Sequence, residues 1–328
     1  MKRTFLLVLS FLYAFCGCCF AQMMPDSTVQ VVAYWALGDK YSFQVKEEKG
    51  VISGTDTTIT EKSAEILTLE VVDETDSTYT LKVSYDDFQH SDYARMAANE
   101  AFEKVYGKTW FNVVTDMYGS FLSLYAPDFS AQAGDAMVSD AIDALAKEKG
   151  LNRNARKMVK SIMEALIAPD ALTTAAIGEI APLLFFHGGR YPLSEEIEFE
   201  EDMLTVFGDG GTVKANGRLW VDEEFTDEVS VVMRIYREAD KDSIRPYFTS
   251  LFATALQAAA PGMTGLDKDE MEEMSAQFDI DLADYIVEEI HLDSGWPLYF
   301  QQTSYVDVWQ GDELLSEQFT NRTVELMD

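Results

Sequence analysis

Residues 185–190 read FFHGGR, and they combine the parts of a catalytic loop more clearly than any other stretch of the chain. His187 is one of only three histidines, and paired glycines after a histidine can point backbone N–H groups at an oxyanion in acyl-transfer enzymes. That chemistry also needs a nucleophilic serine in a Gly-x-Ser-x-Gly turn, which the sequence lacks. We interpret Gly188 and Gly189 as the end of an apolar helix, where a cationic His187 suits the helix dipole.

The other chemistry-bearing residue types are just as scattered. His90, His187 and His291 lie far apart in the sequence, and no His-Glu-x-x-His motif is present. The segment EEIEFEED alternates, so it predicts a solvated strand with Glu196, Glu198 and Glu200 on one face rather than a catalytic pair. We therefore predict no catalytic residue, no metal ligand and no cofactor.

The N-terminus indicates export. Lys2 and Arg3 precede an apolar stretch at residues 5–15, and Ala21 followed by Gln22 is a suitable signal-peptidase cleavage site. A second reading is cleavage before Cys18, which would give an outer-membrane lipoprotein. The prediction is a signal peptide over 1–21 and a periplasmic or secreted mature protein, with the lipoprotein as the alternative.

The charge and the cysteine content of the chain exclude further classes of function, namely nucleic-acid binding and thiol chemistry. The chain has 25 basic and 57 acidic residues, a formal net charge of −32, so its surface repels nucleic acid. All three cysteines lie before the cut at Ala21, so the mature chain needs no disulfide and offers no thiol chemistry. The expected partner is a small apolar or lipid-like ligand, and the oligomeric state stays open.

The elements that must position any site alternate between strands and helices. Strands are predicted for residues 29–35, for the alternating runs KYSFQVKEE and STYTLKVSYDDF, and for most of the chain from 191 onward. A helix is predicted after Ser91 or Asp92, and a longer helical stretch from about 130 to 187 breaks at Pro182.

The resulting fold class is α+β, with a curved antiparallel sheet, open or half-barrel, packed against inserted helices. Residues 22–328 are expected to form a single domain carrying the helical insertion. The apolar segment at 171–186 is shorter than the ~20 residues that a spanning helix needs, so no transmembrane helix is expected in the mature chain.

Four Asp-Ser/Thr-x tripeptides suggest a surface modification. They resemble the Asp-Ser/Thr-apolar sites at which some bacteria with an outer envelope attach O-glycans, and some fall at predicted turns. The candidate acceptors are Ser27, Thr57, Ser77 and Ser243.

Three segments carry a resemblance to a known family: LGDKYSFQV followed by LTLEVVDETDSTYTLKVSY, FNVVTDMYGSF, and YIVEEIHLDSGWPLYFQQTSYV. They resemble a family of exported bacterial proteins of unknown function with an antiparallel-sheet core. The last segment is also similar to periplasmic lipoprotein-carrier half-barrels, which cradle acyl chains. The DSGWPL turn itself is structural, with Gly295 allowing the bend and Trp296 covering the core.

These observations leave three functions open. The first is a non-enzymatic envelope protein that binds or scaffolds an apolar or lipid-like ligand. The second is an envelope hydrolase that uses carboxylates or His187. The third is a structural assembly partner.

Overall fold

The structure is a computed structural model of the whole chain. It describes residues 23–24, 26–106, 110–125, 135–166, 171–193, 195–204, 212–222, 229–249 and 277–327. The strands of these ranges are β1 (Met23–Met24), β2 (Thr28–Gln30), β3 (Lys40–Ser53), β4 (Asp56–Glu74), β5 (Thr78–His90), β6 (Trp110–Asp116), β7 (Phe121–Tyr125), β8 (Arg190–Pro192), β9 (Ile197–Leu204), β10 (Thr212–Val221), β11 (Ser230–Ala239), β12 (Phe278–His291), β13 (Pro297–Gln310) and β14 (Glu313–Leu326). The helices are α2 (Tyr93–Tyr106), α4 (Asp135–Lys149), α5 (Arg153–Leu166), α6 (Ala171–Ile180) and the 3₁₀ helix η2 (Pro182–Leu184), and residues 241–249 are also helical.

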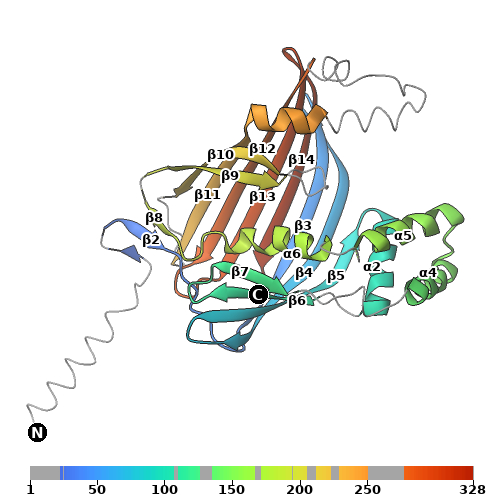
Figure 1. Cartoon of the computed structure of the whole chain (residues 1–328), viewed down its shortest axis with the longest axis horizontal. Helices are drawn as coiled ribbons and strands as arrows, with labels where there is room; N and C mark the ends of the chain where they lie inside the picture. The colour runs from blue at the N-terminus through green and yellow to red at the C-terminus, as the bar shows by residue number, and fades with distance from the viewer. Residues whose placement is uncertain are drawn as a thin grey trace, which may run out of the picture.

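One large antiparallel sheet dominates the molecule (Figure 1). Its eleven strands follow the order β7-β6-β5-β4-β3-β14-β13-β12-β11-β10-β9, and β7 does not pair with β9, so the sheet is curved but unclosed. The last strand, β14, pairs with β3 and joins the N-terminal and C-terminal halves of the sheet. The predicted fold class, α+β with an open antiparallel sheet, is confirmed.

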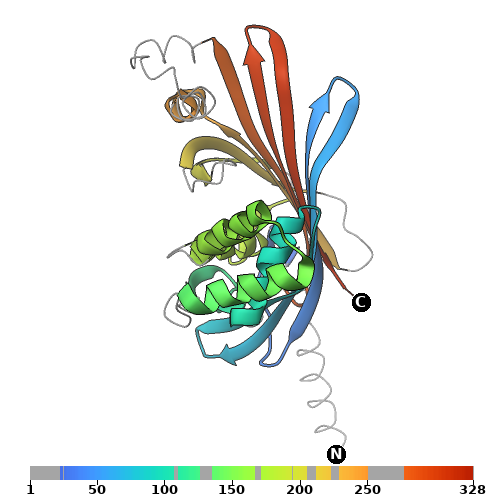
Figure 2. The ribbon, with the colours of Figure 1, turned by 90° about the vertical axis from the view of Figure 1, so that its right-hand side faces the viewer.

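Alternating side chains explain which face of the sheet is buried. On β3 the side chains of Phe43 and Val45 are buried, and on β5 those of Leu81 and Val83 are fully buried, while the residues between them are partly exposed. Such alternation is typical of an antiparallel sheet with one covered face. Figure 2 shows the helices gathered on one side of the sheet, which we call the inner face.

The helices begin and end where the sequence predicts. Asp92 caps α2, because its side chain accepts a hydrogen bond from the backbone N–H of Ala94 at 2.8 Å. Helices α2, α4 and α5 share an apolar core that includes Ala98, Leu145 and Val159. Helix α6 ends at Ile180 and the chain continues as η2 at Pro182, as expected for proline at the end of a helix.

The strand predicted over residues 29–35 is wrong in extent and in partner. Only Thr28–Gln30 are extended in β2, and they pair with β8 in a separate three-stranded sheet with β1. The residues that follow satisfy their backbone groups singly: Ala33 N–H donates to Tyr118 O at 2.9 Å, and Tyr34 N–H donates to Ser294 O at 3.1 Å. The segment is apolar because Val29, Val31, Ala33 and Trp35 are buried in the core, although only its first two residues lie in a strand.

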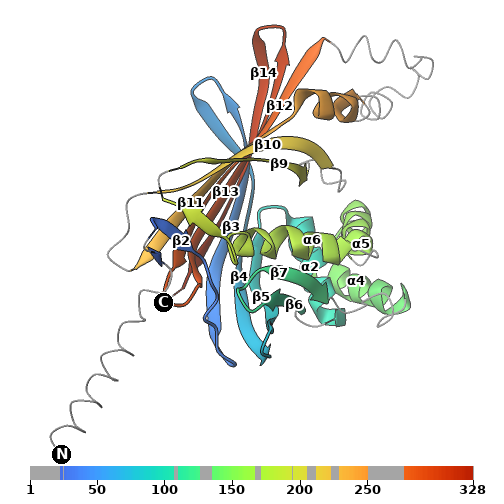
Figure 3. The same cartoon turned by 60° about the vertical axis from the view of Figure 1, so that its left-hand side comes forward.

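Three apolar clusters fill the molecule. The largest lies between the sheet, the segment 29–35 and the end of α6, the second lies among α2, α4 and α5, and the third joins strands β9–β13 to the helix at 241–249. Helix α6 runs across the inner face of the sheet (Figure 3), and its residues Ala176 and Ile180 belong to the largest cluster. In the described ranges no helix has the length and apolar character needed to cross a membrane.

Candidate functional site

Within FFHGGR, Phe186 and His187 are buried in the core, whereas Phe185, Gly188 and Arg190 are exposed. His187 is buried, and its Nε2 atom donates a hydrogen bond to the Gly295 carbonyl at 2.7 Å, while its ring lies 5.5 Å from that of Trp35. Burial lowers the pKa of His187 to about 4, so the ring is neutral at physiological pH. The expectation that a cationic His187 suits the helix dipole is therefore wrong, because desolvation outweighs the dipole. Gly188 does adopt the left-handed conformation, with φ of 77°, that ends the segment.

The DSGWPL turn closes this core from the other side, as predicted. Gly295 has φ of 73°, and a Cβ atom there would lie 2.3 Å from the Val32 carbonyl oxygen. The ring of Trp296 is almost fully buried and lies 4.6 Å from Trp35 and 4.7 Å from Tyr41, measured between ring centroids. Within this cluster Trp35 Nε1, Trp296 Nε1 and His187 Nδ1 are buried and have no hydrogen-bond partner among the described residues.

The remaining histidines stay separate. His90 accepts a hydrogen bond from the backbone N–H of Asp92, and the ring of His291 bonds Ser294, three residues away. Over the part of the chain that the structure describes, no three His, Cys, Asp or Glu side chains are grouped so as to hold a metal ion. Glu196, Glu198 and Glu200 are exposed, at and just before edge strand β9, as their alternation predicts.

The predicted processing and modification sites fall in two groups. Outside the described residues lie Ala21, Gln22 and Cys18. Ser27, Thr57 and Ser77 are exposed at or near turns of strands β2, β4 and β5, whereas Ser243 is partly buried and accepts a hydrogen bond from the Lys214 backbone at 2.8 Å. Cleavage, lipidation and glycosylation all remain predictions.

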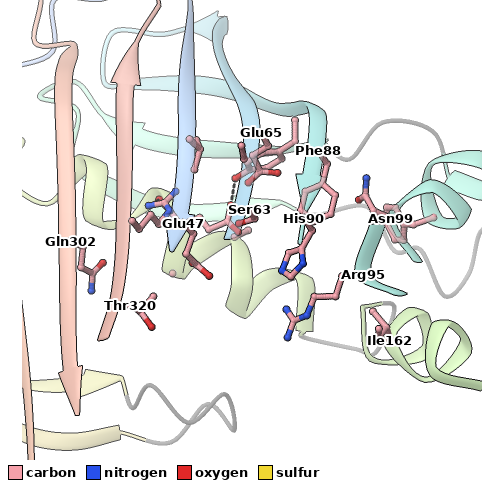
Figure 4. Close-up of a pocket in the computed structure, with 18 of the residues that line it drawn as sticks. Glu47, Ser63, Glu65, Phe88, His90, Arg95, Asn99, Ile162, Gln302 and Thr320 are labelled. Carbon is pink, nitrogen blue, oxygen red and sulfur yellow. Dashed lines mark hydrogen bonds between the residues drawn. The ribbon is translucent and has the colours of Figure 1, made fainter. Parts of the chain in front are cut away.

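A cavity of about 510 Å³ lies where α6 and α2 approach the inner face of strands β3, β4, β5 and β14. Apolar side chains line the part nearest the helices: Val45, Phe88, Phe102, Phe111, Ile162 and Ala176. In Figure 4, Phe88, Asn99 and Ile162 lie on one flank, and Gln302 and Thr320 lie on the opposite flank. A space of this size and mixed lining is typical of small-molecule sites.

A polar cluster occupies the sheet side of this cavity. Tyr85 donates a short hydrogen bond to the carboxylate of Glu179 on α6. Burial, together with the nearby Glu179 charge, raises the pKa of Glu65 to about 8 and outweighs the opposing effect of Arg322. Glu65 is therefore mostly protonated at neutral pH and presents an O–H donor in the cavity wall.

Arg322 provides a second donor. Its Nη1 atom donates to the backbone carbonyl of Glu179 at 3.3 Å, and its guanidinium lies 5.9 Å from the centre of the Phe300 ring. Its Nη2 atom is buried and has no hydrogen-bond partner among the described residues. A buried cationic N–H group without an acceptor is costly, so this atom is available to a ligand.

A second cavity, of about 330 Å³, lies on the other side of α6. It shares three lining residues with the first, Gly178, Gln302 and Ser304. On its polar wall the carboxylates of Glu201 and Asp284 both form ion pairs with Arg237, at 2.8 Å and 2.9 Å. The two cavities therefore flank α6 and are adjacent at Gly178, where a Cβ atom would meet nothing within 4 Å.

Sequence reasoning missed this site, although a signal was present. Glu65 has the same strand parity as buried Leu67 and Leu69, and Arg322 has the same parity as buried Val324. A charged residue at an inward position of an otherwise apolar alternation marks either a paired buried charge or a cavity wall. His187, by contrast, lines neither cavity.

Comparisons with known proteins leave the family open. No protein-family model matches the chain, and no curated protein does. A solved structure described as "lipid-protein interactions in lipovitellin" is similar over 89% of this chain, with 9% sequence identity and a TM-score of 0.41. The chain spans only 25% of that protein's length. At this distance the likeness carries no argument about function.

Proposed function

We propose that this protein is an exported, non-enzymatic binding module for an apolar or lipid-like ligand, which lies in the cavity under α6. The observation that carries the proposal is the cavity itself, of about 510 Å³, with several apolar side chains in its lining and one buried unsatisfied donor, Arg322 Nη2, on its sheet side. Ligand sites combine largely apolar walls with a few placed polar groups in this way. The openness of the sheet lets helices, rather than a second sheet, form the cover.

Gly178 offers a direct test. Because it borders both cavities and has open space where a side chain would project, Gly178→Leu should fill the cavity without a clash. Gly178→Ala is the matched control, and both substitutions favour a helix by up to ~1 kcal/mol. Titration with the apolar fluorophore N-phenyl-1-naphthylamine should show binding to the wild type and Gly178→Ala, and binding at least about tenfold weaker to Gly178→Leu. Equal binding by all three would place the ligand elsewhere.

The export part of the proposal has its own test. Intact mass of the protein from a cell-envelope fraction should correspond to a chain that begins at Gln22, or to a lipidated Cys18 if the lipoprotein alternative holds. The same spectrum reports any glycan on Ser27, Thr57, Ser77 or Ser243 as added mass. An unprocessed chain beginning at Met1 would contradict export.

A second candidate function is an envelope hydrolase, and one observation favours it. Glu65, whose pKa is raised to about 8, lines the same cavity as Glu179, which accepts a hydrogen bond from Tyr85, and two carboxyl groups in different surroundings can supply an acid and a base. The His187 form of this hypothesis has no such support, since His187 lines neither cavity. If the hydrolase is correct, Glu65→Gln should lower turnover of ester or glycan substrates by about 100-fold or more, while apolar-probe binding persists.

A further inference from the structure

The polar side of the cavity contains one buried donor without an acceptor among the described residues, and one protonated carboxyl group. Arg322 Nη2 is buried without a partner among the described residues, and Glu65 adds a carboxylic O–H. Tyr85 is already committed, because its hydroxyl donates to Glu179. A ligand that satisfies this wall must therefore bring hydrogen-bond acceptors.

The charges around the cavity disfavour an anionic acceptor. Glu47, Glu103 and Glu179 line it against the cations Arg95 and Arg322, and burial with the nearby Arg95 lowers the pKa of His90, so this ring adds no charge. The chain as a whole carries a formal charge of −32. A carboxylate or phosphate head would meet this field in a partly desolvated site, where repulsion is only weakly screened.

The apolar walls show where the rest of the ligand lies. Phe88 and Phe111 come from the sheet, Phe102 from α2 and Ile162 from α5, and they lie on the helix side of the polar cluster. Figure 4 shows Glu65 on the sheet side, with Phe88 and Ile162 toward the helices. The cavity is thus amphipathic, and on its helix side the apolar side chains lie beside the polar Arg95 and Asn99.

We propose, on the basis of the proposed function, that the ligand is an uncharged acyl amphiphile. Its ester or hydroxyl oxygens accept hydrogen bonds from Arg322 Nη2 and the Glu65 carboxyl group, and its chain lies against Phe88, Phe102, Phe111 and Ile162. The head group determines which amphiphiles bind: neutral esters bind in preference to fatty acids, phospholipid anions and cationic amphiphiles.

The test compares three ligands with the same chain and different heads: monolauroylglycerol, laurate and dodecyltrimethylammonium. Each competes with N-phenyl-1-naphthylamine on the full mature chain at pH 7, below its aggregation concentration. We expect monolauroylglycerol to displace the probe at a concentration at least about tenfold lower than laurate or the cation, as a site with unsatisfied donors discriminates by head group. Equal or tighter displacement by laurate or by the cation would overturn the head-group proposal.

A substitution at Arg322 tests whether this residue causes the preference for the ester. Arg322→Met keeps the apolar stem and removes the donor, so it should abolish the preference for the ester and leave probe affinity within about twofold. If the variant retains the full preference for the ester, the role proposed for Arg322 is wrong. If the variant does not fold, the competition of the three ligands for the wild-type protein still tests the head-group proposal. Two outcomes distinguish the two proposals. If the probe does not bind at all, the proposed function is wrong. If the probe binds but no head group is preferred, the proposed function stands and only the head-group proposal is wrong.

Discussion

Two regions on the inner face of one sheet differ in what surrounds their polar groups. Around Trp296 the rings of Trp35, Tyr41 and His187 pack together, and the neutral His187 donates one hydrogen bond to a backbone carbonyl. Under α6 the same sheet carries Glu65 and Arg322 at inward positions, and a cavity remains beside them. In the second region Tyr85 and Arg322 hydrogen-bond Glu179 of α6, whereas in the first the aromatic rings pack against one another.

The two regions also show that residues that look reactive in the sequence need not be accessible to a ligand. The histidine and glycines of FFHGGR look reactive in sequence, yet burial leaves His187 neutral and closed to solvent. Glu65 and Arg322 look ordinary within acidic and polar strands, yet they line the space that a ligand can enter. Accessibility to a ligand, rather than residue type, distinguishes the two regions.

The largest expected effect comes from breaking the region around Trp296. Trp296→Ala removes a side chain that is 1% exposed and stacked on Trp35, so it should lower the free energy of unfolding by about 3–5 kcal/mol. Tyr125→Ala, at an exposed position of edge strand β7, should change it by no more than about 0.5 kcal/mol. Urea denaturation measures both. A loss below about 1 kcal/mol at Trp296 would mean that the region is loosely packed.

Glu288, on strand β12, is a further buried polar group of the same sheet. It is fully buried between Met233 and Phe300, neither carboxylate oxygen has a partner, and burial raises its pKa well above the usual range. The native state therefore keeps a proton that the unfolded state releases above pH 4.5, so wild-type stability falls as the pH rises. Glu288→Met should raise the free energy of unfolding by about 2–3 kcal/mol at pH 7 and by less toward pH 4.5.

Exposed Glu198→Met provides the control for this effect, because its carboxyl is solvated in both states. It should give a small change in the free energy of unfolding that does not depend on pH. A Glu288→Met protein less stable than the wild type at pH 7 would show that the carboxyl group has a stabilising partner.

A smaller effect of the same sign is expected in the cavity. The raised pKa of Glu65, about 8 against 4.5 in the unfolded chain, costs stability progressively between these pH values. Glu65→Gln should therefore gain about 1–2 kcal/mol at pH 8 and almost nothing at pH 4.5, a reduced figure because Glu65 is only partly buried. Denaturation across pH 4.5–8.5 checks this, with Asp73→Asn, at an exposed position of the same strand, as the control. A gain that is the same at all pH values would contradict the assignment.

Local patterns in the sequence predicted much of the fold. Alternation placed β3 and β5 and their buried faces, the cap at Asp92 placed the start of α2, and Pro182 placed the end of α6. These features depend on residues close together in the chain. The segment at 29–35 was predicted as a strand because its apolar residues resemble one, and only its tertiary hydrogen bonds show otherwise.

The cavity depends on contacts that no local pattern contains. Glu65 from β4, Glu179 from α6 and Arg322 from β14 meet only because β14 pairs with β3, which joins the two ends of the chain. Parity could have marked Glu65 and Arg322 as inward-facing, but not as neighbours across the sheet. The pairing order of an eleven-stranded sheet was the missing information.

The central claim, that the space under α6 holds a lipid-like ligand, is tested most directly by native mass spectrometry of the protein purified from cell envelopes without detergent. The account predicts one added mass per chain in the wild type and in Gly178→Ala, released on unfolding as an uncharged acyl compound. It predicts the bare polypeptide mass for Gly178→Leu. Bare polypeptide in all three proteins, together with no binding of the apolar probe, would contradict it.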